Sequence, residues 1–216
     1  MKNISLIVYD FDGTLVDTLE DIALGVNLTL RELNLAELPV ATIQQYVGHG
    51  VDNLLRRSLP DVSDNDVQQA VQLFRKYYGE HLTDQTDFYP HGREILEYFS
   101  DRKQAICSNK PEDFVRKILV ELKAEHYFFG VVGGDTVGTK KPDPEGLLTL
   151  IATANVSADQ TLMVGDSVVD IQVGKAAGTK TCVVTFGNGD PEEMRTFSPD
   201  AMIDSLADLK TLIQKI

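Results

Sequence analysis

The chain has 216 residues, 43% of them hydrophobic, and a formal net charge of -13 at pH 7. This length is enough for one well-packed core with a smaller second domain. The excess of acidic residues argues against binding to nucleic acid or acidic membranes, because such binding needs clustered Lys and Arg. We therefore expect small molecules as partners, and the sequence leaves open whether the protein is a monomer or a homodimer.

The sequence contains no apolar run long enough to cross a bilayer, and its first residues enter an apolar segment without a basic stretch or cleavage site. This pattern predicts neither a membrane span nor a signal peptide, so we expect a cytoplasmic protein. Cys107 and Cys182 both lie in apolar, strand-like runs. We expect them to be reduced core cysteines rather than a disulfide or a metal pair.

The first predicted element is a strand over residues 6–9, a short apolar run rich in β-branched and aromatic side chains. Such a run favours a strand buried on both faces. Asp10 follows directly, at the carboxyl end of the strand, where parallel sheets place their ligand sites. There Asp10 could attack a substrate while Asp12 moves protons. A hairpin turn at Asp12-Gly13 is the alternative interpretation of the same residues.

Helical patterns fill the next part of the chain, and no strand is expected among them. Thr18 can cap the first helix, in which apolar residues recur at spacings of three and four. The expected helices cover residues 19–33, 41–47, 51–58 and 65–82. We therefore expect residues 16–86 to form a helical cap domain inserted into a core made of residues 1–15 and 87–216.

Strands and helices alternate through the rest of the chain. Strands are expected at residues 104–108, 131–132, 162–165, 181–185 and 201–203. Helices are expected at residues 92–101, 112–123, 168–177 and 206–215, and after Pro144. This alternation predicts an α/β fold with a doubly wound parallel sheet.

Polar residues lie at or near the ends of several of these strands. They occur in Ile-Cys-Ser-Asn at 106–109, Lys-Pro-Asp-Pro at 141–144 and Met-Val-Gly-Asp-Ser-Val-Val-Asp at 163–170. A parallel sheet brings the strand ends at Asp10, Ser108 and Asp166 to one edge. Taken alone, the segment at 165–167 also fits a helix start capped by Ser167.

Three of the acidic residues, Asp10, Asp166 and Asp170, would form a dense negative cluster at this edge. The mutual repulsion of three carboxylates requires a counter-ion. Mg²⁺ fits, because it is a hard cation that takes oxygen ligands from carboxylates, carbonyls and substrate. We therefore expect Mg²⁺ as a cofactor.

Taken together, these motifs resemble the signature of the haloacid dehalogenase-like superfamily: Asp-x-Asp-Gly-Thr-Leu, a hydroxyl at a strand end, a lysine, and Gly-Asp-x-x-x-Asp. They occur in the family order, and the resemblance covers essentially the whole chain. Within the superfamily the sequence looks closest to the phosphoglycolate phosphatase group. The resemblance implies a phosphomonoester hydrolase that forms an aspartyl phosphate, with 2-phosphoglycolate as the best single candidate substrate.

The same resemblance implies roles for the acidic residues. Asp10 would attack phosphorus, and Asp12 would protonate the leaving alkoxide and later deprotonate water. Asp10, the main-chain oxygen of Asp12, and Asp166 would bind Mg²⁺, and Asp170 would orient its waters. Further substrate contacts are expected from Phe11, Gly13 and Thr14.

The hydroxyl and lysine motifs would act on the phosphoryl group. Ser108 and the amide of Asn109 would hold its oxygens, and Lys141 would balance its charge. Lys141 is chosen over Lys140 because the family's lysine directly precedes a proline, whereas Lys140 is expected to be a solvated surface residue. Lys110 is a further candidate for substrate binding, where its charge would give electrostatic help.

The segment Gly48-His49-Gly50 lies between predicted cap helices. Glycines on both sides let a backbone approach a ligand closely, and the family places a loop of this kind over the active site. We expect these three residues to contact the substrate, with an exposed loop histidine as the alternative for His49. The other histidines show no ligand spacing and are expected to be structural or on the surface: His81, His91 and His126.

Other functions of the same fold stay open, namely pyrophosphatase, nucleotidase, sugar phosphatase and phosphoglucomutase. A dehalogenase would lack the second aspartate, which is present here as Asp12. A β-phosphoglucomutase would pair a histidine with a lysine near the cap loop, and this pairing is missing. A silent binding or regulatory protein is disfavoured because neither Asp10 nor Asp166 is substituted.

Overall fold

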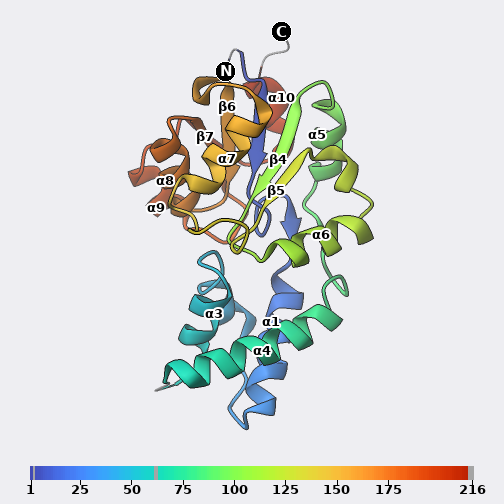
Figure 1. Cartoon of the computed structure of the whole chain (residues 1–216), viewed down its shortest axis with the longest axis vertical. Coiled ribbons are helices and arrows are strands. Elements are labelled where there is room, and N and C mark those ends of the chain that lie inside the picture. The colour runs from blue at the N-terminus through green and yellow to red at the C-terminus, as the bar shows by residue number, and fades with distance from the viewer. Residues whose placement is uncertain (2, 61–62, 214–216) are drawn as a thin grey trace.

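A computed structural model describes residues 1, 3–60 and 63–213. It contains a six-stranded parallel sheet with helices on both faces, in the upper half of Figure 1. The strand order is β5-β4-β1-β6-β7-β8. The strands are β1 Leu6–Tyr9, β4 Lys103–Cys107, β5 Gly130–Val132, β6 Thr161–Gly165, β7 Lys180–Val184 and β8 Ala201–Ile203. The predicted doubly wound α/β class is confirmed.

Strand β1 is apolar throughout because both of its faces are covered. Ile7 and Tyr9 pack in one hydrophobic cluster with side chains of α5 and α6, and Leu6 and Val8 pack in a second cluster with α7 and α8. The helices on the two faces are α5 Gly92–Tyr98, α6 Glu112–Glu121, α7 Glu145–Ala154, α8 Val168–Ala177 and α10 Leu209–Leu212. This burial explains why the strand consists of apolar and aromatic side chains.

Another group of helices, α1 to α4, lies together beyond one edge of the sheet, in the lower half of Figure 1. They are α1 Leu19–Glu32, α2 Val40–Gln44, α3 Val51–Ser58 and α4 Asp64–Glu80. Helix α1 packs against α4 and α2, and α3 packs against α4. This is the region predicted as a cap, and we use that name for α1 to α4. The domain boundaries at residues 16 and 86 stay a prediction.

One part of the cap prediction is wrong. Val16–Asp17 forms a short strand, β2, which pairs antiparallel with β3, Asp87–Phe88, so a strand does occur within residues 16–86. A strand of this length is too short to show a period-two pattern, and its partner is distant in the sequence. The pair joins the two places where the chain enters and leaves the cap region.

Other differences concern the ends of helices. Helix α2 ends at Gln44 and continues only as turns, which shortens the helix predicted to residue 47. The final helix begins as a 3-10 turn at Leu206–Asp208, and the end of its prediction lies outside the described residues. A helix that was not predicted, α9 Pro191–Thr196, is capped by the side chain of Asp190. Cys107 and Cys182 are buried and free, as expected.

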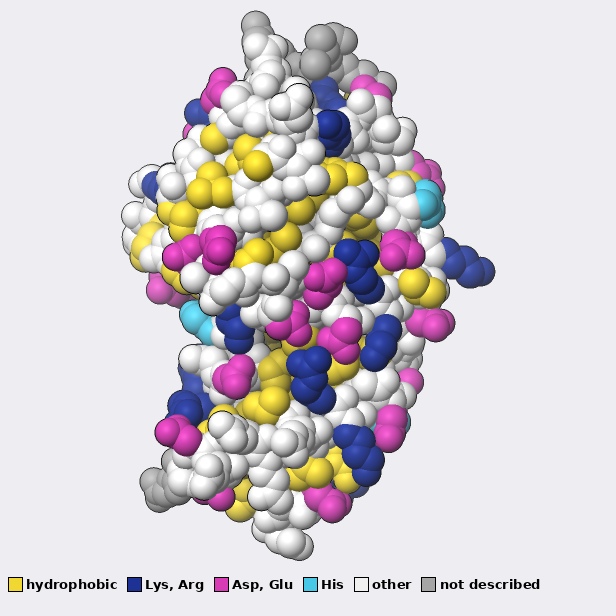
Figure 2. All heavy atoms as spheres, viewed as in Figure 1, with side chains coloured by type: hydrophobic (Ala, Val, Ile, Leu, Met, Phe, Trp, Pro, Cys, Tyr) yellow, Lys and Arg dark blue, Asp and Glu magenta, His cyan; other side chains and the backbone are white. Residues whose placement is uncertain are grey.

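Charged side chains of both signs are interspersed over the face shown in Figure 2, and the outline narrows where the cap meets the sheet-containing part. Across the described residues, no helix combines the length and apolar character that a bilayer crossing requires. The expected absence of nucleic-acid and membrane partners, the cytoplasmic location and the oligomeric state all stay predictions.

A buried carboxylate fixes the segment where the cap ends. Asp21, on α1, is 1% exposed. Its oxygens accept hydrogen bonds from the backbone N–H of Gln85 at 3.0 and 3.1 Å, and from the backbone N–H and hydroxyl of Thr86 at 2.9 and 2.7 Å. Asp21 therefore ties the first cap helix to the return of the chain.

We expect Asp21→Ala to lower the free energy of unfolding by about 3 kcal/mol, because it leaves buried donors without a charged acceptor. Urea unfolding followed by circular dichroism measures this. The matched control is Glu20→Ala, on the exposed side of α1, for which we expect a change below about 0.5 kcal/mol. Equal losses from the two variants would show that the Asp21 contacts add no stability.

Candidate active site

The strand register brings the predicted motifs to one edge of the sheet. Tyr9 on β1 is level with Ile106 on β4 and with Val164 on β6. The residues that follow these strands, Asp10, Ser108 and Asp166 among them, therefore meet at the edge that faces the cap. Because both neighbours of β1 are parallel strands, the alternative of a hairpin at Asp12-Gly13 is wrong.

Three buried carboxylates lie close together at this edge. Asp10, Asp166 and Asp170 each offer an oxygen, and these oxygens lie within 4.8 Å of one another. The Nζ atom of Lys141 is 2.9 Å from Oδ1 of Asp10 and 2.7 Å from Oδ1 of Asp170. When all three carboxylates are ionised, one ammonium leaves the cluster with a net negative charge.

Burial and repulsion act on the protonation of this cluster. Burial raises the pKa of Asp10 to about 6, although the neighbouring Lys141 lowers it. Burial, followed by the charges of Asp10 and Asp170, raises the pKa of Asp166 well above its ordinary value. Buried carboxylate oxygens that repel one another are suited to binding a hard divalent cation. The residues therefore fit the Mg²⁺ ion that the sequence analysis predicts.

The turn after Asp10 is shaped around Asp166. Gly13 has φ +81°, and a Cβ there would lie 2.2 Å from Oδ2 of Asp166, so only glycine fits. The hydroxyl of Thr14 donates to Oδ1 of Asp166 at 3.3 Å, and the backbone N–H of Asn188 donates to Oδ2 at 2.7 Å. Gly13 and Thr14, predicted as substrate contacts, thus contact a candidate metal ligand.

Asn188 is a site residue that the sequence analysis missed. It lies in the segment Gly187-Asn188-Gly189, shortly after β7. A Cβ on either glycine would lie within 2.3 Å of an atom of Asp166. The paired glycines are the same signal that drew attention to residues 48–50, and they could have indicated this close approach.

Asp170 serves two purposes at once. Its Oδ1 contacts Lys141, whereas its Oδ2 accepts hydrogen bonds from the backbone N–H groups of Asp166 and Ser167 and, at 2.6 Å, from the hydroxyl of Ser167. Ser167 is the N-cap of α8, in a capping box with Asp170. The alternative interpretation of a capped helix start is therefore correct, and it coexists with membership in the carboxylate cluster.

Asp12 belongs to a second charged group, on the cap side. Its Oδ1 accepts a hydrogen bond from Nζ of Lys110 at 2.9 Å and one from the hydroxyl of Thr18 at 2.5 Å. Thr18 stands at the N-cap position of α1, but its side chain makes no capping hydrogen bond. The Thr18 hydroxyl, which was predicted to cap helix α1, donates its hydrogen bond to Asp12 instead.

Lys110 also contacts the cap. Its Nζ donates to the hydroxyl of Tyr78, on α4, at 2.6 Å. Burial alone would lower the pKa of Lys110, but the charge of Asp12 raises it above its ordinary value. Tyr78 and Thr18 were missed in the sequence because each contacts the site only through tertiary packing. The structure thus places the Lys110 ammonium beside the Asp12 carboxylate, where it can stabilise the negative charge of Asp12.

Asn109 joins the core to the cap loop through its side chain. Its Nδ2 donates to the backbone oxygens of Gly48 and Lys141, each at 3.0 Å, and its Oδ1 accepts from the backbone N–H of Lys141 at 2.9 Å. The neighbouring residue Lys140 is exposed, and its Nζ lies 3.3 Å from Oδ2 of Asp52 on α3. The expected contrast between a buried Lys141 and an exposed Lys140 is confirmed.

The cap loop is only partly placed as expected. Gly48 and Gly50 have φ of +106° and +85°, in the region that favours glycine, and both line a pocket with Asp10. His49 is exposed and does not line that pocket; it borders a neighbouring cavity with Asp166 and Ser167.

Phe11 contacts Asp10 through its backbone, and the substrate contact expected from Phe11 stays a prediction. Its side chain is completely buried in the hydrophobic core, and its backbone N–H donates to Oδ1 of Asp10 at 2.7 Å. His81 and His91 pair with Asp84 and Glu94 on the surface. The structure brings none of these three side chains into the pocket with Asp10.

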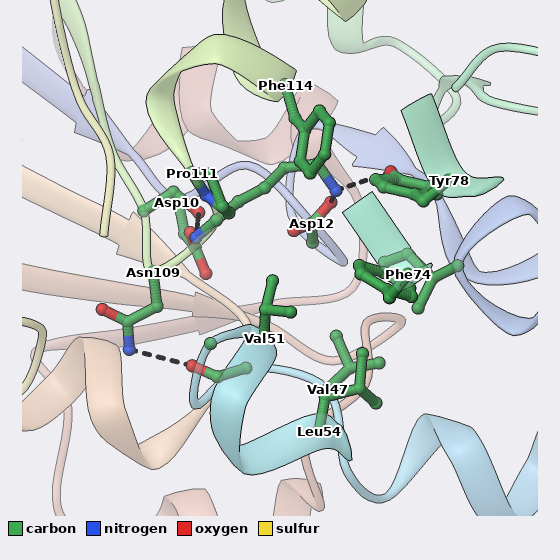
Figure 3. Close-up of a pocket in the computed structure, with 15 residues that line it drawn as sticks. Asp10, Asp12, Val47, Val51, Leu54, Phe74, Tyr78, Asn109, Pro111 and Phe114 are labelled. Carbon is green, nitrogen blue, oxygen red and sulfur yellow. Dashed lines mark hydrogen bonds and ion pairs between the residues drawn. The ribbon is translucent and has the colours of Figure 1, made fainter. Parts of the chain in front are cut away.

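A pocket connects Asp10 and Asp12 to the cap (Figure 3). Apolar side chains from the cap helices and from α6 face it. The lining residues are Asp10, Asp12, Ile22, Val47, Gly48, Gly50, Val51, Leu54, Phe74, Tyr78, Ser108, Asn109, Lys110, Pro111 and Phe114. Ser108 is 4% exposed at its floor. The residues of the sequence motifs thus face a pocket whose other walls come largely from the cap.

Comparison with known proteins agrees with this geometry. The sequence profile of the family described as "Haloacid dehalogenase-like hydrolase" matches residues 7–184. The chain belongs to this family. Membership accounts for the order of the motifs and for the insertion of helices between the first two strands of the sheet.

Relatives within this family share most of the chain. A protein of Nitrosospira multiformis named phosphoglycolate phosphatase is 36% identical over 98% of this chain and 96% of its own. One of Aquifex aeolicus with the same name is 37% identical over 96% of each. A crystal structure titled as a predicted phosphoglycolate phosphatase from Haemophilus somnus has a TM-score of 0.92 and 29% identity, covering 97% of this chain and 98% of its own.

Removing the Lys141 ammonium should destabilise the fold, because Asp10 and Asp170 would lose their buried counter-charge. We expect Lys141→Met to lower the free energy of unfolding by about 3 kcal/mol in the presence of EDTA. Lys140→Met, which removes an exposed pair with Asp52, should cost less than about 1 kcal/mol. Urea unfolding of both variants under the same conditions makes the comparison, and similar losses would contradict the assigned difference.

Proposed function

We propose that the protein is a magnesium-dependent phosphomonoester hydrolase that acts through an aspartyl-phosphate intermediate, with 2-phosphoglycolate as its substrate. The observation that carries the proposal is the position of Asp10. Its carboxylate is held by Lys141 and the N–H of Phe11 in a cluster of oxygen ligands, at the floor of a pocket that opens to the cap. The names of relatives at 36% and 37% identity support the choice of substrate.

In the first step a carboxylate oxygen of Asp10 attacks phosphorus, and the bond from phosphorus to the leaving oxygen breaks. Asp12, as a carboxylic acid, gives its proton to that oxygen. Lys110 and Thr18 both contact Oδ1 of Asp12, so Oδ2 is the oxygen that carries the proton. In the second step Asp12 takes a proton from water, which attacks phosphorus and releases phosphate and the Asp10 carboxylate.

The metal site of this proposal consists of Asp10, the main-chain oxygen of Asp12, and Asp166, with Asp170 orienting bound waters. When bound, Mg²⁺ neutralises the carboxylates and the phosphoryl oxygens. Thr14 and Asn188 hold Asp166 in place for this task.

The neutral and basic residues have complementary tasks in the proposal. Ser108 and the backbone amide of Asn109 bind phosphoryl oxygens, and Lys141 stabilises the charge that develops during transfer. The Asn109 side chain positions the Lys141 backbone and links it to Gly48. Gly48 and Gly50 shape the wall that faces the leaving group, whereas a substrate contact from His49 would need the loop to move.

Asp10→Asn should abolish turnover while the fold is retained, because the amide has nearly the same shape but is a poor nucleophile. We expect a loss of more than about 1,000-fold in kcat for 2-phosphoglycolate. Steady-state phosphate release measures it, and the circular dichroism spectrum serves as the control for folding. Activity retained within tenfold would contradict the covalent mechanism.

Replacing Asp166 should separate metal binding from the fold. In the native protein, Mg²⁺ should raise the Tm, because a ligand that binds only the folded state stabilises it and here also relieves repulsion. Asp166→Asn should lose this rise, together with activity. A matched control is Asp135→Asn, an exposed carboxylate that accepts the backbone N–H of Glu112. An unchanged Mg²⁺ response in Asp166→Asn would show that the ligands lie elsewhere.

A panel of phosphate esters, assayed with and without Mg²⁺, distinguishes this substrate from the alternatives. Pyrophosphate, nucleotides and sugar phosphates represent the other activities left open by the sequence. If any of these compounds has a higher kcat/KM than 2-phosphoglycolate, the proposed substrate is wrong.

A further inference from the structure

The end of the pocket that faces the leaving group is almost entirely apolar. Its walls include Ile22, Val47, Val51, Leu54, Phe74 and Phe114. Apart from the core residues Asp10, Asp12, Ser108 and Asn109, the lining residues contain one charged side chain, Lys110, and one other polar side chain, Tyr78. Among the residues that line this pocket, Lys110 is therefore the one positively charged group that could bind an anionic group on the leaving part of a substrate.

Lys110 is held rigidly in this position. Its side chain is 4% exposed and donates to Oδ1 of Asp12 and to the hydroxyl of Tyr78. The Tyr78 ring is stacked on Phe74 and meets the edge of Phe114, each at 5.2 Å between ring centroids (Figure 3). An ammonium has three N–H donors, and its hydrogen bonds among the described residues use two. The third donor is available to a ligand.

The position of Lys110 matches the chemistry of the proposed substrate. Asp12 must reach the oxygen that bridges phosphorus and the leaving group, and Nζ of Lys110 lies 2.9 Å from Asp12. In 2-phosphoglycolate the carboxylate carbon is separated from that bridging oxygen by a single methylene. A carboxylate there falls within reach of the ammonium. The surrounding apolar walls offer few polar groups, and the lower local dielectric strengthens the attraction between opposite charges.

We propose that Lys110, positioned by Tyr78, binds the carboxylate of the leaving group and thereby selects carboxylated phosphate esters over neutral ones. This inference rests on the proposed function, because it concerns the same pocket. Lys110 comes from the loop after β4 and Tyr78 from α4, so the selective group is shared between core and cap. Tyr78 is a positioning residue, since it acts through the ammonium.

The test compares 2-phosphoglycolate with ethyl phosphate, in which a methyl group replaces the carboxylate. The measured quantity is the ratio of their kcat/KM values in the presence of Mg²⁺. A ratio is needed because Lys110 also contacts Asp12, so its loss slows both reactions and that shared effect cancels. We expect the native enzyme to prefer 2-phosphoglycolate and Lys110→Met to lower this ratio by about 10- to 100-fold.

Matched variants separate charge from structure. Lys140→Met removes an exposed lysine outside the pocket and should leave the ratio unchanged. Lys110→Arg keeps the positive charge and should retain most of the preference. Tyr78→Phe keeps the ring but removes the hydroxyl that fixes the ammonium, and we expect the ratio to fall by about 3- to 10-fold.

Two failures can be distinguished. If the native enzyme hydrolyses neither ester with Mg²⁺, the proposed function is wrong and the inference falls with it. If it hydrolyses both, but Lys110→Met keeps the native ratio within twofold, the inference alone is overturned. Should Lys110→Met not fold, Tyr78→Phe decides, because an unchanged ratio there also overturns the inference.

Discussion

The contact between Lys141 and two carboxylates is the constraint on which the rest of the site depends. Asp10 and Asp170 share one buried ammonium, and without it their mutual repulsion would not be tolerated at such low exposure. The backbone of Lys141 is in turn held by the Asn109 side chain. One asparagine thus fixes the backbone of Lys141, and the Lys141 ammonium contacts Asp10 and Asp170.

Elements with strong local signals could be predicted from the sequence. Strand β1 and helices α3 and α8 have the expected bounds, because an apolar run or a regular spacing defines each of them. The β2-β3 pair could not be predicted, since its strands are two residues long and pair across the whole cap. Such a pairing is set by how two parts of the chain dock.

Some residues of the candidate site could be predicted from the sequence, and others could not. The carboxylates, Ser108 and Lys141 stand in motifs whose order along the chain is informative, and the sheet brings them together. Thr18 and Tyr78 carry no such signal, because a threonine before a helix ordinarily caps it and a tyrosine within a helix ordinarily fills a core. Here the hydroxyl of each contacts the charged pair of Asp12 and Lys110. Only the fold reveals this second use.

The hydrophobic interior runs from the sheet into the cap without a break. One cluster of buried side chains contains Ile7 of β1 together with Ile22 and Phe74 of the cap. Leu15, which lies just before the short strand β2, belongs to the same cluster. The cap is therefore not a module that could be exchanged freely between relatives. A different cap would have to pack against the same buried apolar side chains of the sheet-containing part. Replacing cap residues that line the pocket would therefore also change the packing between the two parts.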